Sequence, residues 1–444
     1  MSRFYIIAGL FGCITLSPLS AQTVMSLREC MQFAVSNATK VRIQKAAIGD
    51  AQIARRDAAL ALFTPQVSAS TSAYYNFGRS IDPQTNTYNN STSFHNSYGV
   101  SAGYDLFDGF QAVNNYRISK VAVWMAQTEE KQVEADICLA VMQAYYNVVY
   151  YCRLSDVYKA QVQVAEAAVA KARRQEQLGQ KGHADVVQME ADLADRQYEL
   201  TNTLSTLQTE QIILQDLMFW PMSDTLVIDT VLPEYEDVLL PARSVVDYAL
   251  ENTPTVQVAS YKQLNARREL STAKWQLLPT LSLYAGWNTS YFTHSGVEPA
   301  SFASQFVNNG GEYVQLTLSL PVWNRLGRLS RISKKKHALQ RASAEWEQQR
   351  RDVESEVRRA VLDRDGSAAA YRQAQYKARV QAEAYALSIR KMEQGLVSPM
   401  EFQTANNNYL KSRADEMYSL LTFLIKQAVV RYYAGTNYID QLIR

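Results

Sequence analysis

The stretch Leu178–Asp192, LGQKGHADVVQMEAD, interrupts a long helical pattern and starts a second, shorter helix. A second stretch, QGLVSPMEFQTANNN, runs from Gln394 to Asn408 and has the same character. Each carries a glycine where one helix would end and an acidic residue in the first turn of the next. The two Gly-centred breaks therefore predict two helical hairpins.

The hairpins belong to two halves that align at a nearly constant offset of about 215 residues. The matched positions are Ala34–Asn37 with Ala249–Asn252, Pro65 with Pro279, Gly179 with Gly395, and Asp185 with Glu401. Several anchors in the same order indicate a tandem structural repeat. We expect a first repeat at 22–218, a joint at 219–243, a second repeat at 244–434 and a C-terminal tail at 435–444.

Each repeat predicts a short helix, a medium helix, two strands and a helical hairpin, at about 112–218 in the first half and 326–434 in the second. The descending helix of each hairpin would be roughly 100 Å long at ~1.5 Å per residue. The returning helix and the medium helix, stacked end to end, would nearly match that length. Leucine and alanine stripes in these helices have coiled-coil spacing, so we expect a tube of packed helices.

Four segments alternate apolar and small polar residues, at about 66–77, 97–107, 280–292 and 312–323. Each has about the length that a tilted strand needs to cross a bilayer, and aromatic residues gather towards the ends. A soluble β-sandwich is the alternative. Four strands cannot close a barrel, because open edges in lipid leave backbone groups unpaired. Three chains would supply the twelve strands of a closed one.

The first 21 residues are typical of a secretory signal peptide, with Arg3, an apolar run and a small residue, Ala21, before the cut. A lipoprotein signal ending at Cys13 is the alternative. The remaining cysteines, Cys30, Cys138 and Cys152, predict no disulfide, and the histidines show no metal-ligand spacing. We expect no metal, no cofactor and no enzymatic activity. The net charge of +2 gives no reason to expect nucleic acid as a partner.

Together these features resemble the TolC-like outer-membrane efflux proteins. The resemblance is carried by Ala34–Asn37, Ala249–Asn252, the stretch LFDGF (Leu106–Phe110) after the second strand, and the two Gly breaks. It implies an α+β membrane protein: a homotrimer with a twelve-stranded transmembrane β-barrel continuous with a long α-helical coiled-coil periplasmic tunnel. An equatorial belt would form from the 219–243 joint and the tail.

The resemblance also implies a place and partners. The chain would lie in the outer membrane of a Gram-negative bacterium, in contact with lipid, and extend into the periplasm. There it would meet a periplasmic adaptor (membrane fusion) protein and an inner-membrane transporter of RND or ABC type. It would act as a passive export duct, opened at its hairpin tips by these partners.

By the same resemblance, the hairpin tips form the inner mouth of the tunnel. The implied adaptor-contact residues are Gly179, Gly182, Gly395, Leu396 and Ser398, and the implied gate residues are Asp185, Glu401 and Thr404. Thr404 stands where the family commonly has an acid, so this gate would be less acidic. The residues themselves allow another interpretation, since an acid in the first turn of a helix is favoured by the helix dipole alone.

Two further alternatives stay open at this point. A basic run from Arg325 to Arg341 could face lipid head groups or the tunnel, or form a solvated helix face. The chain could also be a trimeric coiled-coil surface adhesin with a barrel anchor. An adhesin, however, predicts one C-terminal anchor rather than strands in both halves.

Overall fold

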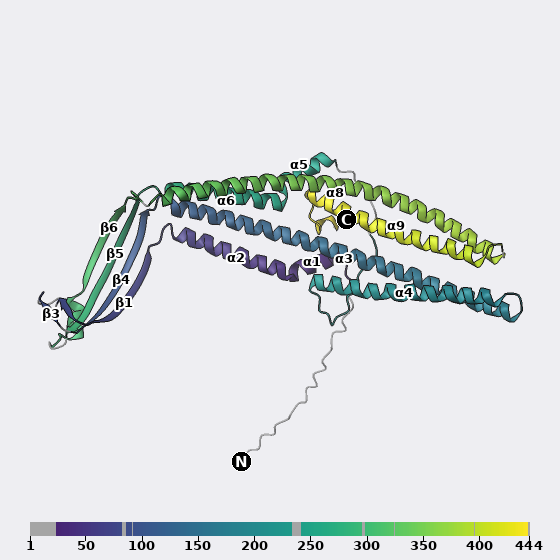
Figure 1. The fold of residues 1–444 in the computed structure, drawn as a ribbon, viewed down its shortest axis with the longest axis horizontal. Coiled ribbons are helices and arrows are strands. Elements are labelled where there is room, and N and C mark those ends of the chain that lie inside the picture. The colour runs from purple at the N-terminus through teal and green to yellow at the C-terminus, as the bar shows by residue number, and fades with distance from the viewer. Residues whose placement is uncertain are drawn as a thin grey trace, which may run out of the picture.

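The structure is a computed structural model, and it describes residues 24–81, 86–90, 92–232, 241–294, 298–323, 325–394 and 396–442. The chain is elongated, with a β-sheet at one end and the tips of two helical hairpins at the other (Figure 1). The expected signal peptide lies outside the described residues, as does the stretch 233–240 of the expected joint. Each end of the elongated chain is built from elements of both halves of the sequence.

The two halves contain the same helices with nearly the same lengths, which confirms the tandem repeat. The first-half helices are α1 (Leu27–Asn37, 11 residues), α2 (Thr39–Leu60, 22), α3 (Gln111–Gln177, 67) and α4 (His183–Met218, 36). Their second-half counterparts are α5 (Ala242–Asn252, 11 residues), α6 (Pro254–Trp275, 22), α8 (Gly327–Glu393, 67) and α9 (Pro399–Tyr433, 35). In each half the medium helix and the returning helix lie along one long helix (Figure 1).

Each half contributes two strands to one antiparallel sheet in the order β1-β4-β5-β6. The strands are β1 (Gln66–Asn76), β4 (Ser93–Phe107), β5 (Thr280–His294) and β6 (Gly311–Ser319). β1 and β6 form the two edges, and neither has a second partner within the described chain. Strands thus come from both halves, whereas the adhesin alternative predicts a single C-terminal anchor.

The pairing register gives the sheet two different faces, as the alternation predicts. On one face Val67, Ala102, Ala285 and Val314 form a row across all four strands. Val67 and Val314, at its two ends, are 65% and 78% exposed. The other face carries hydroxyl pairs, including Ser72 and Ser97, whose Oγ atoms lie 2.8 Å apart. The sheet thus exposes a continuous apolar face.

Several boundaries differ from the sequence expectations. β4 begins at Ser93, earlier than residue 97, because its first residues pair with the end of β5, up to His294. β6 ends at Ser319 rather than near 323, since Pro321 has no N–H for the ladder. The links between strands, expected as loops, contain a small hairpin of β2 (Arg79–Ile81) and β3 (Tyr88–Asn90) and the short helix α7 (Phe302–Asn308).

Helix α7 covers the end of β5 that extends beyond β6. The Gln305 side chain accepts a hydrogen bond from the Phe292 N–H (3.0 Å) and donates one to the Phe292 carbonyl (3.0 Å). On the apolar face Phe306 packs against Tyr98 and Trp287, with ring centroids 5.5 and 5.6 Å away. The buried amide of Gln305 therefore replaces the strand that β5 lacks at this level.

Two hydrophobic cores lie where the short helices meet end to end. The larger joins α1, the middle of α3 and the end of α4 to the last turns of α9, and includes the buried residues Met31, Val149, Leu214 and Phe423. Near the C-terminal 3₁₀ helix η1 (Asp440–Leu442), Tyr438 stacks on Tyr432 of α9 at 4.8 Å and joins this core. The smaller core consists mainly of valines from α5, α6, α8 and α9. These cores fix the returning helices α4 and α9 against the long helices and the short helices α1 and α5.

Among the described helices, none is both long enough and apolar enough to cross a membrane.

Candidate functional site

The first hairpin tip reverses at Gly179. After α3 ends, Gly179 adopts φ +68°, a left-handed conformation that glycine tolerates at low cost. The Gly179 N–H donates to the Glu176 carbonyl (2.8 Å), and the Gln180 N–H donates to the Gln175 carbonyl (2.8 Å). These two bonds form a Schellman motif and satisfy carbonyls at the end of the helix.

Gly182 differs from Gly179, although both are tip candidates. It is the N-cap of α4, with φ −76° and extended backbone, so its conformation does not require glycine. No side chain caps this helix start. Nearby, the His183 Nδ1 lies 2.8 Å from the Glu176 carboxylate and links the two sides of the tip.

The second tip ends α8 in a similar way and then starts α9 with a stronger cap. The Leu396 N–H donates to the Lys391 carbonyl (2.9 Å) across the reversal, while Gly395 itself lies outside the described residues. Ser398 is the N-cap of α9. Its Oγ accepts from the Glu401 N–H (3.2 Å), and the Glu401 carboxylate accepts from the Ser398 N–H (3.1 Å). This is a capping box.

The three gate candidates therefore have different surroundings. The Glu401 carboxylate is engaged in the capping box, and the exposed Thr404 hydroxyl donates to the Met400 carbonyl of its own helix (2.9 Å). The Asp185 carboxylate has no hydrogen-bond or ion-pair partner among the described residues. It lines a groove of about 460 Å³ between the two hairpins, together with Lys181, Asp192 and Phe402. Of the two acidic candidates, Asp185 is thus the one whose carboxylate has no partner among the described residues.

A polar cluster that the sequence analysis missed joins the two hairpins just above this groove. The Arg196 guanidinium of α4 donates to the Asp192 carboxylate (3.0 Å) and to the Asn407 side-chain carbonyl of α9 (2.5 Å). Gln403 of α9 donates to the same Asp192 oxygen (2.9 Å). Only 9% of the Arg196 side chain is exposed, so this charge relies on these partners.

A second branch of the cluster reaches α3 and α8. Asn406 of α9 donates to the Gln161 side-chain oxygen of α3 (3.0 Å). Tyr385 of α8 lies beside Gln161 and stacks on Tyr409 with centroids 5.1 Å apart. Burial raises the pKa of Tyr385, and a hydrogen bond with Gln161 partly offsets the rise. All four helices of the two hairpins therefore meet in this cluster.

One part of this cluster could have been predicted from the sequence. Asp192 and Arg196 are spaced i, i+4, which predicts a pair on one helix face. Their partners on α9 lie 211 positions further along the chain, and no local pattern reports such a contact.

The arrangement matches known proteins in fold. A model of the family described as outer membrane efflux protein matches residues 34–218 and 245–435. The crystal structure of the Campylobacter jejuni CmeC outer membrane channel aligns with a TM-score of 0.79 at 15% identity, over 94% of this chain and 87% of that one. The outer membrane protein VceC of Vibrio cholerae aligns at 0.75 and 15%, over 92% and 96%.

The open state of the Neisseria gonorrhoeae MtrE outer membrane channel also aligns, with a TM-score of 0.75 at 15% identity, over 92% of this chain and 88% of that one. No curated protein matches the chain in sequence. At this identity the solved structures establish the fold, and the family model, which covers both repeats, establishes the kinship.

Proposed function

Because the chain belongs to the outer membrane efflux protein family, and is thus an outer membrane efflux channel rather than an enzyme, we propose that three copies of it form one export duct. The observation that carries this proposal is the four-stranded sheet, with an exposed apolar face and two unpaired edges. Edges cannot stay open in lipid. Three sheets joined edge to edge would close a twelve-stranded barrel, with the hydroxyl-lined face towards the lumen.

The hairpins would continue this barrel as a periplasmic tunnel whose inner mouth lies at the tips. Three copies of Asp185 around an axis would concentrate negative potential at a constriction. Because the Glu401 carboxylate is held in the capping box, we assign Glu401 first to stabilising the start of α9. Its role in the gate would depend on that position. Thr404 adds no charge, whereas Glu401 keeps its negative charge in the capping box, so Asp185 and Glu401 would together set the selectivity of the mouth.

The tips also have the character of a contact surface for a partner. Leu178 at the first tip and Leu396 and Met400 at the second are 71%, 69% and 75% exposed, so both tips present large apolar side chains. A periplasmic adaptor would cover this surface, with Gly179, Gly182, Gly395, Leu396 and Ser398 at the contact. An energised inner-membrane transporter of RND or ABC type would then supply the work of export.

The cluster around Arg196 suits the role of a latch that keeps the mouth narrow. It joins the returning helices α4 and α9 close to the groove that contains Asp185, through the bonds from Arg196 to Asn407 and from Gln403 to Asp192. Widening the mouth would separate the hairpins and break these two hydrogen bonds to charged groups, together with the neutral bond from Asn406 to Gln161. The partner's binding energy would have to meet the cost of breaking them.

Conductance in planar lipid bilayers tests the duct. We expect the purified protein to give discrete, cation-selective steps, because Asp185 lines the mouth. Asp185→Asn should lower the preference for cations, whereas Asp195→Asn, a change to an exposed acid of the same helix, should leave it unchanged. Complete absence of conductance, in the native chain and in variants with a weakened latch, would contradict the proposal.

A further inference from the structure

A run of basic side chains lies at the start of helix α8, directly after the last strand of the sheet (Figure 1). The stretch 325–341 contains seven lysine or arginine residues and no aspartate or glutamate. The equivalent stretch of the first repeat, 109–125, starts the equally long helix α3 beside the same sheet and contains only two. The start of a long helix at this place therefore does not require the charge.

The chain itself neutralises little of this charge. Lys335 pairs with the Glu269 carboxylate of α6 at 2.6 Å, and Arg331 donates to the neutral side-chain oxygen of Gln276 (2.7 Å). Four members of the run are exposed and have no hydrogen-bond or ion-pair partner among the described residues: Arg325, Lys334, Lys336 and Arg341. Because the helix dipole also opposes positive charge near a helix N-terminus, the run favours a negative partner outside the chain.

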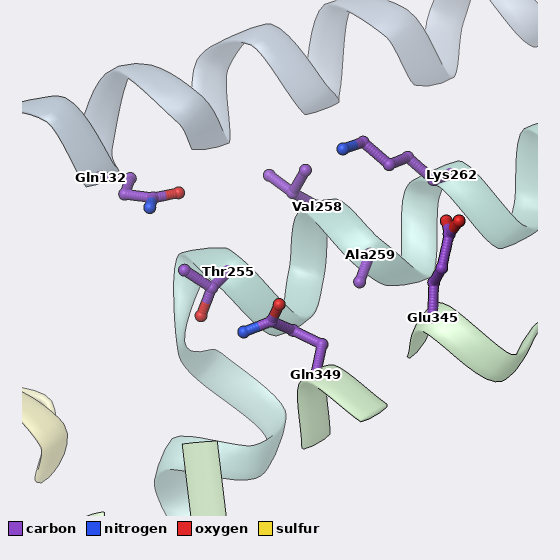
Figure 2. Close-up of a pocket in the computed structure, with 7 residues that line it drawn as sticks. All are labelled: Gln132, Thr255, Val258, Ala259, Lys262, Glu345 and Gln349. Carbon is purple, nitrogen blue, oxygen red and sulfur yellow. The ribbon is translucent and has the colours of Figure 1, made fainter. Parts of the chain in front are cut away.

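The first acidic residue of α8 does not compensate the run. Glu345 comes after Arg341 and lines a pocket between α3, α6 and α8, which it shares with Lys262 of α6 (Figure 2). The nearest carboxylate of the helix thus has another positive charge in its surroundings. The positive potential of the run therefore extends over the first turns of α8 and is open to solvent.

Large apolar side chains surround the start of the basic run. Five of them are between 52% and 85% exposed: Leu320, Val322, Trp323, Leu326 and Leu329. Leu316 and Leu318 of β6, which are exposed on the apolar face of the sheet, precede this cluster in the chain. Apolar side chains, an aromatic ring and adjacent basic groups are the combination found where a protein leaves the hydrocarbon core and meets the lipid head groups.

The internal repeat indicates which part of this surface stays free in a trimer. Helix α3 packs against both α2 and α6, and in the proposed trimer α8 would pack against α6 and the α2 of a neighbouring copy. Aligned from their first residues, Leu329 and Lys336 of α8 correspond to Val113 and Lys120 of α3. Both of these α3 residues remain exposed between the two flanking helices. Leu329 and Lys336, two turns apart, therefore share a helix face that a neighbouring copy would leave open.

We propose that the basic and apolar side chains around the start of α8 form a docking surface for anionic phospholipids. The apolar side chains would lie beside acyl chains, while Arg325, Lys334 and Lys336 would attract the phosphate groups of the lipid heads. A wall of the tunnel, the other place for a basic run, would not require exposed leucines and Trp323 beside it. The inference rests on the proposed duct, whose barrel puts the apolar face of the sheet in lipid.

The lipids that bind the intact trimer provide the test. The purified trimer in a neutral detergent is titrated with phosphatidylglycerol or phosphatidylcholine of the same acyl chains, and bound lipids are counted by native mass spectrometry. We expect at least about fivefold tighter binding of phosphatidylglycerol, and a smaller preference when the ionic strength is raised. Glycerol 1-phosphate, which has the anionic group but no acyl chains, should not displace the lipid at equal ionic strength.

Removing the unpaired charges gives the sharper test. The triple variant Arg325→Gln, Lys334→Gln, Lys336→Gln should reduce the preference for phosphatidylglycerol by about threefold or more. A matched control removes the same charge from exposed positions of α8 and α9 away from the sheet and should keep the preference: Arg351→Gln, Arg390→Gln, Lys411→Gln.

Equal binding of the two lipids by the native trimer, or an undiminished preference in the triple variant, would overturn the proposal. A triple variant with altered ion selectivity and unchanged lipid preference would also overturn it, because the run would then line the tunnel. Conductance of the same trimers is recorded in planar bilayers. Channels without a lipid preference would contradict only the docking surface, whereas trimers that never conduct would contradict the duct.

Discussion

At the scale of single residues, the two glycines of the first tip show how backbone conformation separates a required glycine from a tolerated one. Gly179 has φ +68°, whereas Gly182 has φ −76°. An added Cβ would meet no atom within 4 Å at either position. Any difference between substitutions at these two sites therefore comes from the backbone and not from crowding.

We expect Gly179→Val to destabilise the tip by about 1–2 kcal/mol, because a side chain disfavours the left-handed conformation. The matched control is Gly366→Val, at an exposed glycine of α8 that has no positive φ and lies away from the tips, and it should change little. Dye accumulation in cells that carry each variant, with trimer assembly checked by size-exclusion chromatography, measures the effect. We expect export to fall for Gly179→Val alone, with assembly intact. Equal export by the two variants would remove the Gly179 reversal from the mechanism.

At the scale of elements, the two hairpins contact each other near the tips through a few polar side chains, whereas further from the tips a hydrophobic core joins α3 and α4 to α9. Arg196 contributes from α4, and Asn407 contributes from α9. The two hydrophobic cores lie further from the tips, beside α1 and α5. The tips can thus separate while the cores stay packed.

Arg196→Gln should weaken the contact between the hairpins by ~1–3 kcal/mol, because Asp192 and Asn407 lose their shared charged donor. We expect a higher open probability in single-channel recordings. Arg413→Gln is the matched control, since Arg413 is half-exposed and pairs with Glu416 within α9 alone. An unchanged open probability for Arg196→Gln would show that the cluster does not restrain the mouth.

The same elements show what the sequence could predict. The long helices, the strand alternation and the repeat were predictable, because helical and strand periodicities and the offset between halves are local or regular signals. Helix α7 was not, because its place depends on hydrogen bonds between the Gln305 side chain and the Phe292 backbone, at a level of β5 that lies before the start of β6. The partners of Arg196 were also missed, since they are side chains that meet across helices far apart in the sequence.

At the scale of the whole molecule, the four-stranded sheet of one chain has two edge strands, β1 and β6, that have no second partner among the described residues. Val67 and Val314 belong to the same row of the apolar face but stand on opposite edges. Within one chain they are separated by the width of three strand spacings, about 14 Å. Between neighbouring chains of a closed barrel, β1 and β6 would be adjacent.

A cross-linking experiment follows from this geometry. The double variant Val67→Cys with Val314→Cys, with Cys152 replaced by serine, would be treated with a bis-maleimide that reaches about 8 Å, too short to span one sheet. We expect cross-linked dimers and trimers and nothing larger. Each single variant should give neither. Monomers only, or an open ladder beyond three chains, would contradict the closed trimer.

The equal lengths of α3 and α8 also limit how this chain can evolve. One residue inserted into either helix would shift its tip by about 1.5 Å and turn everything beyond it by about 100°. The two long helices must therefore keep the same length. An insertion in one is tolerated only if it adds a whole heptad repeat, which preserves the apolar face, and if the other helix gains the same insertion. Substitutions of exposed side chains along α3 and α8 are therefore easier to accept in evolution than any change in the length of these helices.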